Sequence, residues 1–173
     1  MIGRPSAWMP CLALTAAAIL AQPASAQHRA HTHGQADLDV AIDGPRLSLA
    51  LTAPANDVVG FEHAPRNAEQ EAAVAAAEAM LRAPAELFAL PPAAGCKVAA
   101  VKAQAPWPRP GDDAHADFTA QWDFDCADPS KLAYIDVRLV EQLPGKVRMK
   151  VTVIDARGQS RSELRRGRIR LSL

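Results

Sequence analysis

The sequence predicts an α+β fold: an antiparallel β-sheet or sandwich of about six or seven strands, with a helical insert between the second and third strands. Two observations predict it. Apolar and polar residues alternate along most of the chain, as in strands with one buried face. A single segment rich in alanine and glutamate interrupts this alternation. Because no crossover helices separate the later strands, the order of elements favours antiparallel pairing.

A β-hairpin is expected first, over residues 36–52. Its apolar residues alternate with polar ones on both sides of the turn "DGPR". The loop "TAPANDVVGFEHAP" follows. A helix is predicted next, because Asn67 is a good N-cap, Gln70 lies three residues further on, and "AEQEAAVAAAEAMLR" is rich in helix formers. A short helical turn at "PAELFAL" completes the insert.

The rest of the chain returns to the alternation of strands. Its cleanest example is "DFTAQWDFDC", whose aromatic residues all face one way. The connection "AQAPWPRPGDDAHAD" has three prolines and is predicted to be a surface loop. The arginines of residues 157–173 alternate with strand-like residues, which favours the solvated face of an edge strand. The strands after the insert are expected at residues 96–101, 117–126, 133–139, 147–153 and 169–173.

Residues 1–26 have the layout of a secretory signal peptide, with a positive charge at Arg4, an apolar stretch and the small-residue ending "ASA". Residues 27–173 are then expected to form a single exported domain, without membrane insertion, because no second apolar run follows. Cys96 and Cys126 remain after cleavage. In an oxidising compartment such a pair predicts a disulfide. Thiolate metal ligation is the weaker alternative, since the Cys-x-x-Cys spacing is absent.

Charge and motifs exclude several classes of function. The chain has 19 basic and 19 acidic residues and a net charge of zero, so it has no large field of one sign to bind nucleic acid. Neither a G-x-S-x-G nucleophile elbow nor an H-E-x-x-H helix is present. If the disulfide forms, no free thiol is left as a nucleophile. We therefore expect a protein without catalytic activity.

Three of the five histidines fall within "HRAHTH", directly before the predicted hairpin. Residues two apart in an extended segment point the same way, so His31 and His33 can present imidazoles side by side. Such imidazoles suit zinc, copper or nickel. A zinc site usually has three or four protein ligands, so other residues must complete this one. The further candidates are His28, then Glu62 and His63 of "GFEHAP", and His115 with Asp112 and Asp113 in the proline-rich connection.

Several stretches, in this order along the chain, resemble the ZrgA-like family of periplasmic proteins linked to zinc uptake in Gram-negative bacteria. They are "HTHGQADLDVAIDG", "APANDVVGFEHAP", "ALPPAAGC" and "FDCADP". The resemblance implies a periplasmic zinc-binding accessory that works beside a transporter. It places His31 and His33 on the family's H-x-H-G start and Glu62 with His63 on its G-F-E-H motif. It also matches Cys96 and Cys126 to the family's cysteine pair.

One departure from the family pattern bears on capacity. Many members carry a long stretch rich in histidine and aspartate between the cysteine-bearing strands, and this chain has only "RPGDDAHAD" there. The comparison implies one or two zinc ions at defined sites instead of a high-capacity store. We expect His31, His33 and His63 to be the main ligands, followed by Glu62 and His115, and then His28. Because neutral imidazole is the ligand, zinc affinity should fall below about pH 6.5.

A second hypothesis comes from a different class of protein. The chain could be an exported structural or protein-interaction module whose histidines are incidental, docking a partner through an open strand edge or the "DVVGF" loop. Titration with zinc distinguishes the two, because only the first predicts saturable binding.

Overall fold

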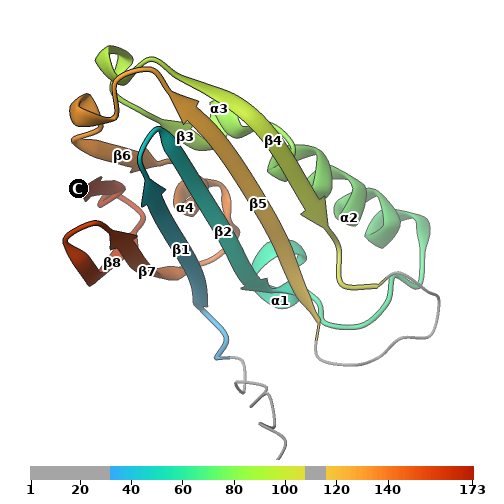
Figure 1. Cartoon of the computed structure of the whole chain (residues 1–173). Coiled ribbons are helices and arrows are strands. Elements are labelled where there is room, and N and C mark those ends of the chain that lie inside the picture. The colour runs from blue at the N-terminus through green and yellow to red at the C-terminus, as the bar shows by residue number, and fades with distance from the viewer. Residues whose placement is uncertain (1–31, 108–115) are drawn as a thin grey trace, which may run out of the picture.

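A computed structural model describes residues 32–107 and 116–173, which form two β-sheets with helices packed between and beside them (Figure 1). The larger sheet has six strands in the order β4-β5-β2-β1-β7-β8, and the smaller has the order β3-β6-β9. The strands of the large sheet are β1 (Gln35–Asp43), β2 (Arg46–Pro54), β4 (Cys96–Gln104), β5 (Asp117–Cys126), β7 (Arg148–Asp155) and β8 (Gly158–Arg165). Those of the small sheet are β3 (Phe88–Ala89), β6 (Tyr134–Val137) and β9 (Arg170–Ser172).

This arrangement confirms the α+β class and the helical insert after the second strand. The large sheet differs from the expectation in being mixed: β1 pairs antiparallel with β2 but parallel with β7. Antiparallel neighbours can be joined by a tight hairpin, as β1 and β2 are, whereas a parallel pair needs a long connection. Between β1 and β7 the chain builds helices α1 to α4, three strands of the large sheet (β2, β4 and β5) and two of the small one (β3 and β6), so that requirement is met.

The helices occupy the insert and one later position. They are α1 (Ala55–Val59), α2 (Ala68–Leu81), α3 (Pro84–Leu87) and α4 (Leu139–Gln142), with 3-10 turns at Pro92–Ala94 and Pro129–Lys131. The predicted N-cap of α2 is confirmed, because the Asn67 side chain accepts a hydrogen bond from the Gln70 backbone N–H at 2.9 Å. In return, the Gln70 side chain accepts from the Arg66 N–H at 2.8 Å. The first of these bonds satisfies a backbone N–H that has no partner inside the helix, and the second holds the residue that precedes the N-cap.

Two local assignments made from the pattern were wrong. Leu139 was expected to continue a strand, but it begins α4, whose Leu139 and Val140 are buried together with Leu143. Leu139 and Leu143, four residues apart, lie on the same side of a helix and also on the same face of a strand. The apolar pattern alone therefore does not distinguish the two. The loop after the first hairpin contains the five-residue helix α1, which ends where Gly60 takes the left-handed conformation, φ 86°.

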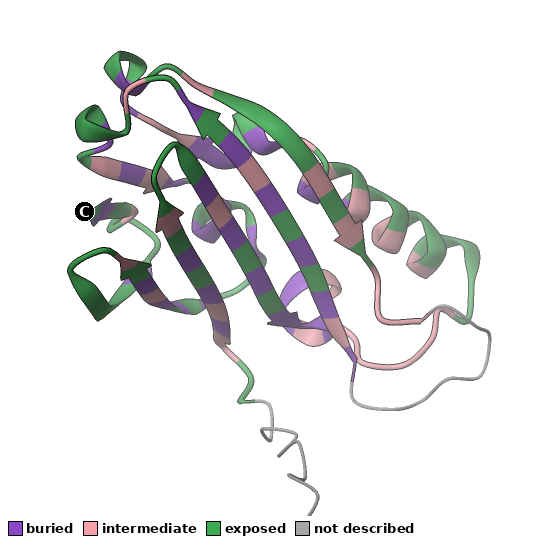
Figure 2. Cartoon of the chain, viewed as in Figure 1, coloured by how far each residue is buried: buried purple, intermediate pink, exposed green. Residues whose placement is uncertain are grey.

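One face of the large sheet forms the core. Figure 2 shows buried and exposed residues alternating along β1, β2 and β5. Trp122 of β5 is fully buried, and its indole Nε1–H donates to the Leu81 carbonyl at 2.7 Å. That carbonyl lies in the last turn of α2, where helix carbonyls lack intrahelical partners. A core side chain therefore ties α2 to the sheet that it covers.

The C-terminal part of α2 is also bound to the segment at the end of β4, beside which the helix runs in Figure 1. Arg82 donates to the Ala103 carbonyl at 3.0 Å, and the Ala105 N–H donates to Glu78 at 3.1 Å. Burial raises the pKa of Glu78, but the hydrogen bonds from Arg82 and Ala105 outweigh it, so the pKa lies below its ordinary value. Two charged side chains thus satisfy backbone groups of the strand edge.

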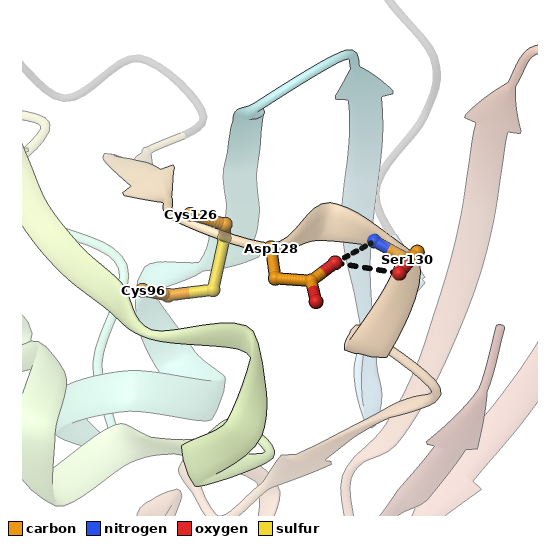
Figure 3. Close-up of a disulfide and its surroundings, with 4 residues drawn as sticks. All are labelled: Cys96, Cys126, Asp128 and Ser130. Atoms are coloured by element: carbon orange, nitrogen blue, oxygen red, sulfur yellow. Dashed lines mark hydrogen bonds between the residues drawn. A yellow bond between two sulfur atoms is a disulfide. The ribbon is translucent and has the colours of Figure 1, made fainter.

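The predicted disulfide is present and joins β4 to β5, where Cys96 and Cys126 face each other in register (Figure 3). The chain turns away just after Cys126, and Asp128 stabilises that turn by accepting hydrogen bonds from the backbone and hydroxyl of Ser130. At the other side of the sheet, β8 is an edge strand, and Leu164 is its one buried residue. Its exposed arginines agree with the expectation of a solvated edge.

Among the described residues, no helix is both long enough and apolar enough to cross a membrane.

Candidate metal-binding site

His33 lies in a tight turn immediately before β1. The turn is closed by a hydrogen bond from the Gln35 N–H to the Thr32 carbonyl, 3.2 Å long. Gly34 takes φ 77° at its third position, in the left-handed region that side chains with a Cβ rarely adopt. The Gly34 carbonyl accepts from the Arg148 N–H of β7 at 2.9 Å. The glycine of "HTHG" is therefore needed for the backbone conformation that positions His33.

Asp57 of α1 holds the same turn from the other side. It is 6 % exposed and is the one buried charged residue in the part of the chain that the structure describes. Both of its carboxylate oxygens accept from the Gly34 N–H, at 2.9 and 2.8 Å, and one also accepts from the Gln35 N–H at 3.2 Å. Two consecutive backbone donors thus form a concave anion site, which the protein fills with its own carboxylate.

The contact between His33 and Glu62 brings the two predicted metal-binding motifs together. His33 Nε2 lies 2.7 Å from Glu62 Oε1, although the two residues are 29 positions apart. Glu62 comes two residues after Gly60, at which α1 ends. The His33 side chain is 61 % exposed and that of Glu62 is 32 % exposed, so an ion in solution can reach the pair.

His63 follows Glu62, but its ring is engaged elsewhere. It stacks on Phe61, with ring centroids 5.2 Å apart, and Phe61 stacks on Trp107 at 5.6 Å. His63 Nδ1 lies 2.9 Å from the Ala64 carbonyl, so this nitrogen carries the hydrogen and Nε2 keeps the lone pair. Nε2 is therefore the ring nitrogen of His63 that is left for a metal ion, and His63 directly follows Glu62 in the sequence.

The connection that carries His115 is anchored near these residues at both of its described ends. Trp107, before it, belongs to the ring stack with Phe61 and packs edge-on against Phe118 of the core. Ala116, after it, accepts a hydrogen bond from the N–H of Ala55, the first residue of α1, at 2.8 Å. The two ends of this connection thus meet α1 and the loop that follows it.

The outcome for the predicted ligands is mixed. The structure brings His33 and Glu62 into contact, and no group of three His, Cys, Asp or Glu side chains within residues 32–107 and 116–173 could hold a metal ion. His28, His31 and His115, with Asp112 and Asp113, lie outside the described residues. Asp57 was missed in the sequence. The available signal was the one acidic residue between the predicted hairpin and the G-F-E-H motif, followed there by two valines.

A comparison with models of protein families shows to which family the chain belongs. The model of the ZrgA family, described as zinc uptake proteins, matches residues 30–173. The chain belongs to the ZrgA family. No curated protein matches it. Membership in ZrgA connects the chain with zinc uptake, and the donors that meet here, imidazole and carboxylate, are both ordinary zinc ligands. The β-rich fold with its Cys96–Cys126 disulfide extends over the same matched residues.

Proposed function

We propose that the chain is an exported, soluble periplasmic protein that binds zinc and assists its uptake, without catalysing a reaction. In this role it carries zinc as cargo and passes the ion to a component of a zinc transporter. Two findings support the proposal: membership in a zinc uptake family, and donors from two of its motifs in direct contact.

The single observation that carries the proposal is how His33 and Glu62 meet. The pair spans two segments that Asp57 fastens together through three hydrogen bonds. Exposed ion pairs contribute little to stability, so stability alone gives a weak reason for this arrangement. A metal site gains from it, because a side chain held in place before the ion arrives loses less freedom on binding.

The ligands besides His33 are drawn from His63 and from the predicted donors outside the described residues, His28, His31 and His115. Zinc that is to be passed on must exchange, and sites that exchange a ligand keep an open coordination position. We therefore propose one or two ions, each held by two or three protein donors, instead of a closed structural site.

Calorimetric titration of residues 27–173 with zinc tests the proposal. The wild type is expected to bind with saturation, and His33→Ala is expected to weaken binding at least tenfold. Glu69→Ala is the matched control, because Glu69 is an exposed acidic residue at the start of α2, outside both motifs. The control is expected to bind like the wild type.

Two results would count against the proposal. Absence of saturable binding in the wild type would leave the interaction-module hypothesis in its place. Unchanged binding in His33→Ala and in His63→Ala would move the site away from the described donors, and His31→Ala and His115→Ala would then locate it.

A further inference from the structure

The two ring nitrogens of His33 are not equivalent. Nε2 lies 2.7 Å from Glu62 Oε1, whereas Nδ1 has no protein partner within the described residues. The side chain is 61 % exposed. A carboxylate accepts hydrogen bonds and cannot donate them, so Nε2 carries the hydrogen in this contact. In the neutral imidazole the lone pair is then on Nδ1.

We propose that Glu62 is a positioning residue and not a zinc ligand, and that His33 binds the ion through Nδ1. This inference rests on the proposed function, since it names the atom that takes the zinc at that site. A carboxylate that accepts from the far nitrogen of a metal-bound histidine fixes the ring's tautomer and orientation and makes the other nitrogen a better ligand.

Distance argues against both groups binding the same ion in this arrangement. Zinc–nitrogen and zinc–oxygen bonds are about 2.0–2.2 Å long, so two ligand atoms of a tetrahedral site lie roughly 3.3 Å apart. The 2.7 Å between His33 Nε2 and Glu62 Oε1 is that of a short hydrogen bond and leaves no room for an ion between them. Joint ligation would require breaking this contact, whereas binding at Nδ1 preserves it.

The backbone on both sides of the pair is fixed by contacts that do not involve a metal. On the His33 side, Asp57 accepts from the N–H groups of Gly34 and Gln35. On the Glu62 side, the neighbouring Phe61 stacks on Trp107 with an angle of 14° between the rings. The orienting hydrogen bond is therefore in place before zinc arrives, as an outer partner of a ligand has to be.

Long-range ¹H–¹⁵N correlation spectra of the histidine rings, recorded on residues 27–173 with and without one equivalent of zinc, test the inference. In the wild type, zinc is expected to shift His33 Nδ1 while Nε2 keeps its hydrogen. A spectrum in which Nε2 loses its hydrogen and takes the metal would overturn the inference. So would saturable binding that leaves both His33 nitrogens unshifted, and in these two cases the proposed function would stand.

Variants at Glu62 give the second measurement. Glu62→Ala is expected to weaken zinc binding 10- to 100-fold, the usual effect of removing a partner that orients a ligand. In this variant, zinc is no longer expected to bind His33 through Nδ1 alone, so the Nδ1 signature, the zinc-induced shift of Nδ1 with Nε2 still protonated, should be lost. Glu62→Gln keeps an acceptor oxygen, so it is expected to retain the Nδ1 signature with a smaller loss. Glu69→Gln is the control and should match the wild type. Unchanged affinity in Glu62→Ala would overturn the inference, and absence of zinc binding in the wild type would overturn the proposed function with it.

Discussion

Asp57 determines the position of His33. The Asp57 carboxylate accepts hydrogen bonds from the backbone N–H groups of Gly34 and Gln35, the two residues that follow His33. It is buried, so neither the carboxylate nor its donors are well placed to bond to water instead. A side chain outside both the H-x-H-G turn and the G-F-E-H motif thus joins the two.

Replacing Asp57 with alanine should therefore affect stability and zinc binding together. The change leaves the N–H groups of Gly34 and Gln35 without their acceptor, which costs about 1–3 kcal/mol. Urea unfolding measures this loss, and calorimetry should show weaker zinc binding because the turn is released. Asp39→Ala, at an exposed position of β1, is the control. A stability equal to that of the control would show that the Asp57 hydrogen bonds contribute nothing.

Residue patterns made part of this site predictable and left part of it hidden. His33 and Glu62 were recognisable as candidates because histidine and glutamate are common zinc ligands and cluster here in two short stretches. Their contact was not, because His33 and Glu62 are 29 positions apart, and nothing local encodes which atoms meet. Gly34 was part of a recognised motif. The reason why a glycine is needed there is its positive φ next to the buried carboxylate of Asp57, and that depends on the tertiary structure.

At the scale of elements, the disulfide holds the edge strand β4 to β5. The two cysteines are 30 positions apart, and closing a loop of that length in the unfolded chain stabilises the fold by roughly 3–4 kcal/mol. The double variant Cys96→Ala/Cys126→Ala should lose about that much free energy of unfolding, as measured in urea. Its zinc affinity should equal that of the wild type, since neither sulfur is a ligand. A large loss of affinity with the fold intact would restore the thiolate alternative.

The small sheet has its own electrostatic link, between β6 and β9. Arg170 donates twice to Asp136, both at 2.7 Å, and its guanidinium lies 4.1 Å from the centre of the Tyr134 ring. The hydrogen bonds from Arg170 are the largest cause that holds the pKa of Asp136 below its ordinary value, against a smaller opposite effect of burial. This paired carboxylate therefore favours the folded state as long as it is ionised.

The sign of the resulting pH dependence follows from that depressed pKa. The contribution of Asp136 is complete above the pKa of an unfolded aspartate, about 3.9, and is lost as the pH falls through the lower folded value. Asp136→Asn should therefore be less stable than the wild type at pH 7, with the difference shrinking below about pH 4. Urea unfolding from pH 7 to pH 3 measures it. Asp43→Asn, a change at an exposed position at the end of β1, is the control. A stability difference between Asp136→Asn and the wild type that is constant with pH would contradict the argument.

Elements were predictable where local pattern decides them. The β1–β2 hairpin and the N-cap of α2 followed from alternation and capping chemistry. The parallel placement of β7 beside β1 did not, because alternation states which face of a strand is buried but not which strand lies next to it. Helices of four or five residues, such as α1 and α4, are too short to show a helical period.

For the molecule as a whole, the site lies where several distant segments meet. The turn before β1 contacts α1 through Asp57, contacts the loop after α1 through Glu62, and contacts β7 through Arg148. Unfolding separates all of these segments, so it destroys the site. A ligand that binds only the folded chain must then stabilise it according to its concentration and affinity.

Zinc should accordingly raise the free energy of unfolding of residues 27–173. At a free concentration 100 times Kd, the gain for one site is about 2.7 kcal/mol. In His33→Ala at the same free zinc, a tenfold weaker Kd should reduce the gain to about 1.4 kcal/mol. Urea unfolding in zinc-buffered solutions measures both, and a chelator should return each protein to its metal-free stability. The histidines of the unfolded chain also bind zinc and lower the absolute gains, so the difference between the two proteins is the test. Equal gains would mean that zinc is held without His33, by donors that do not need this turn.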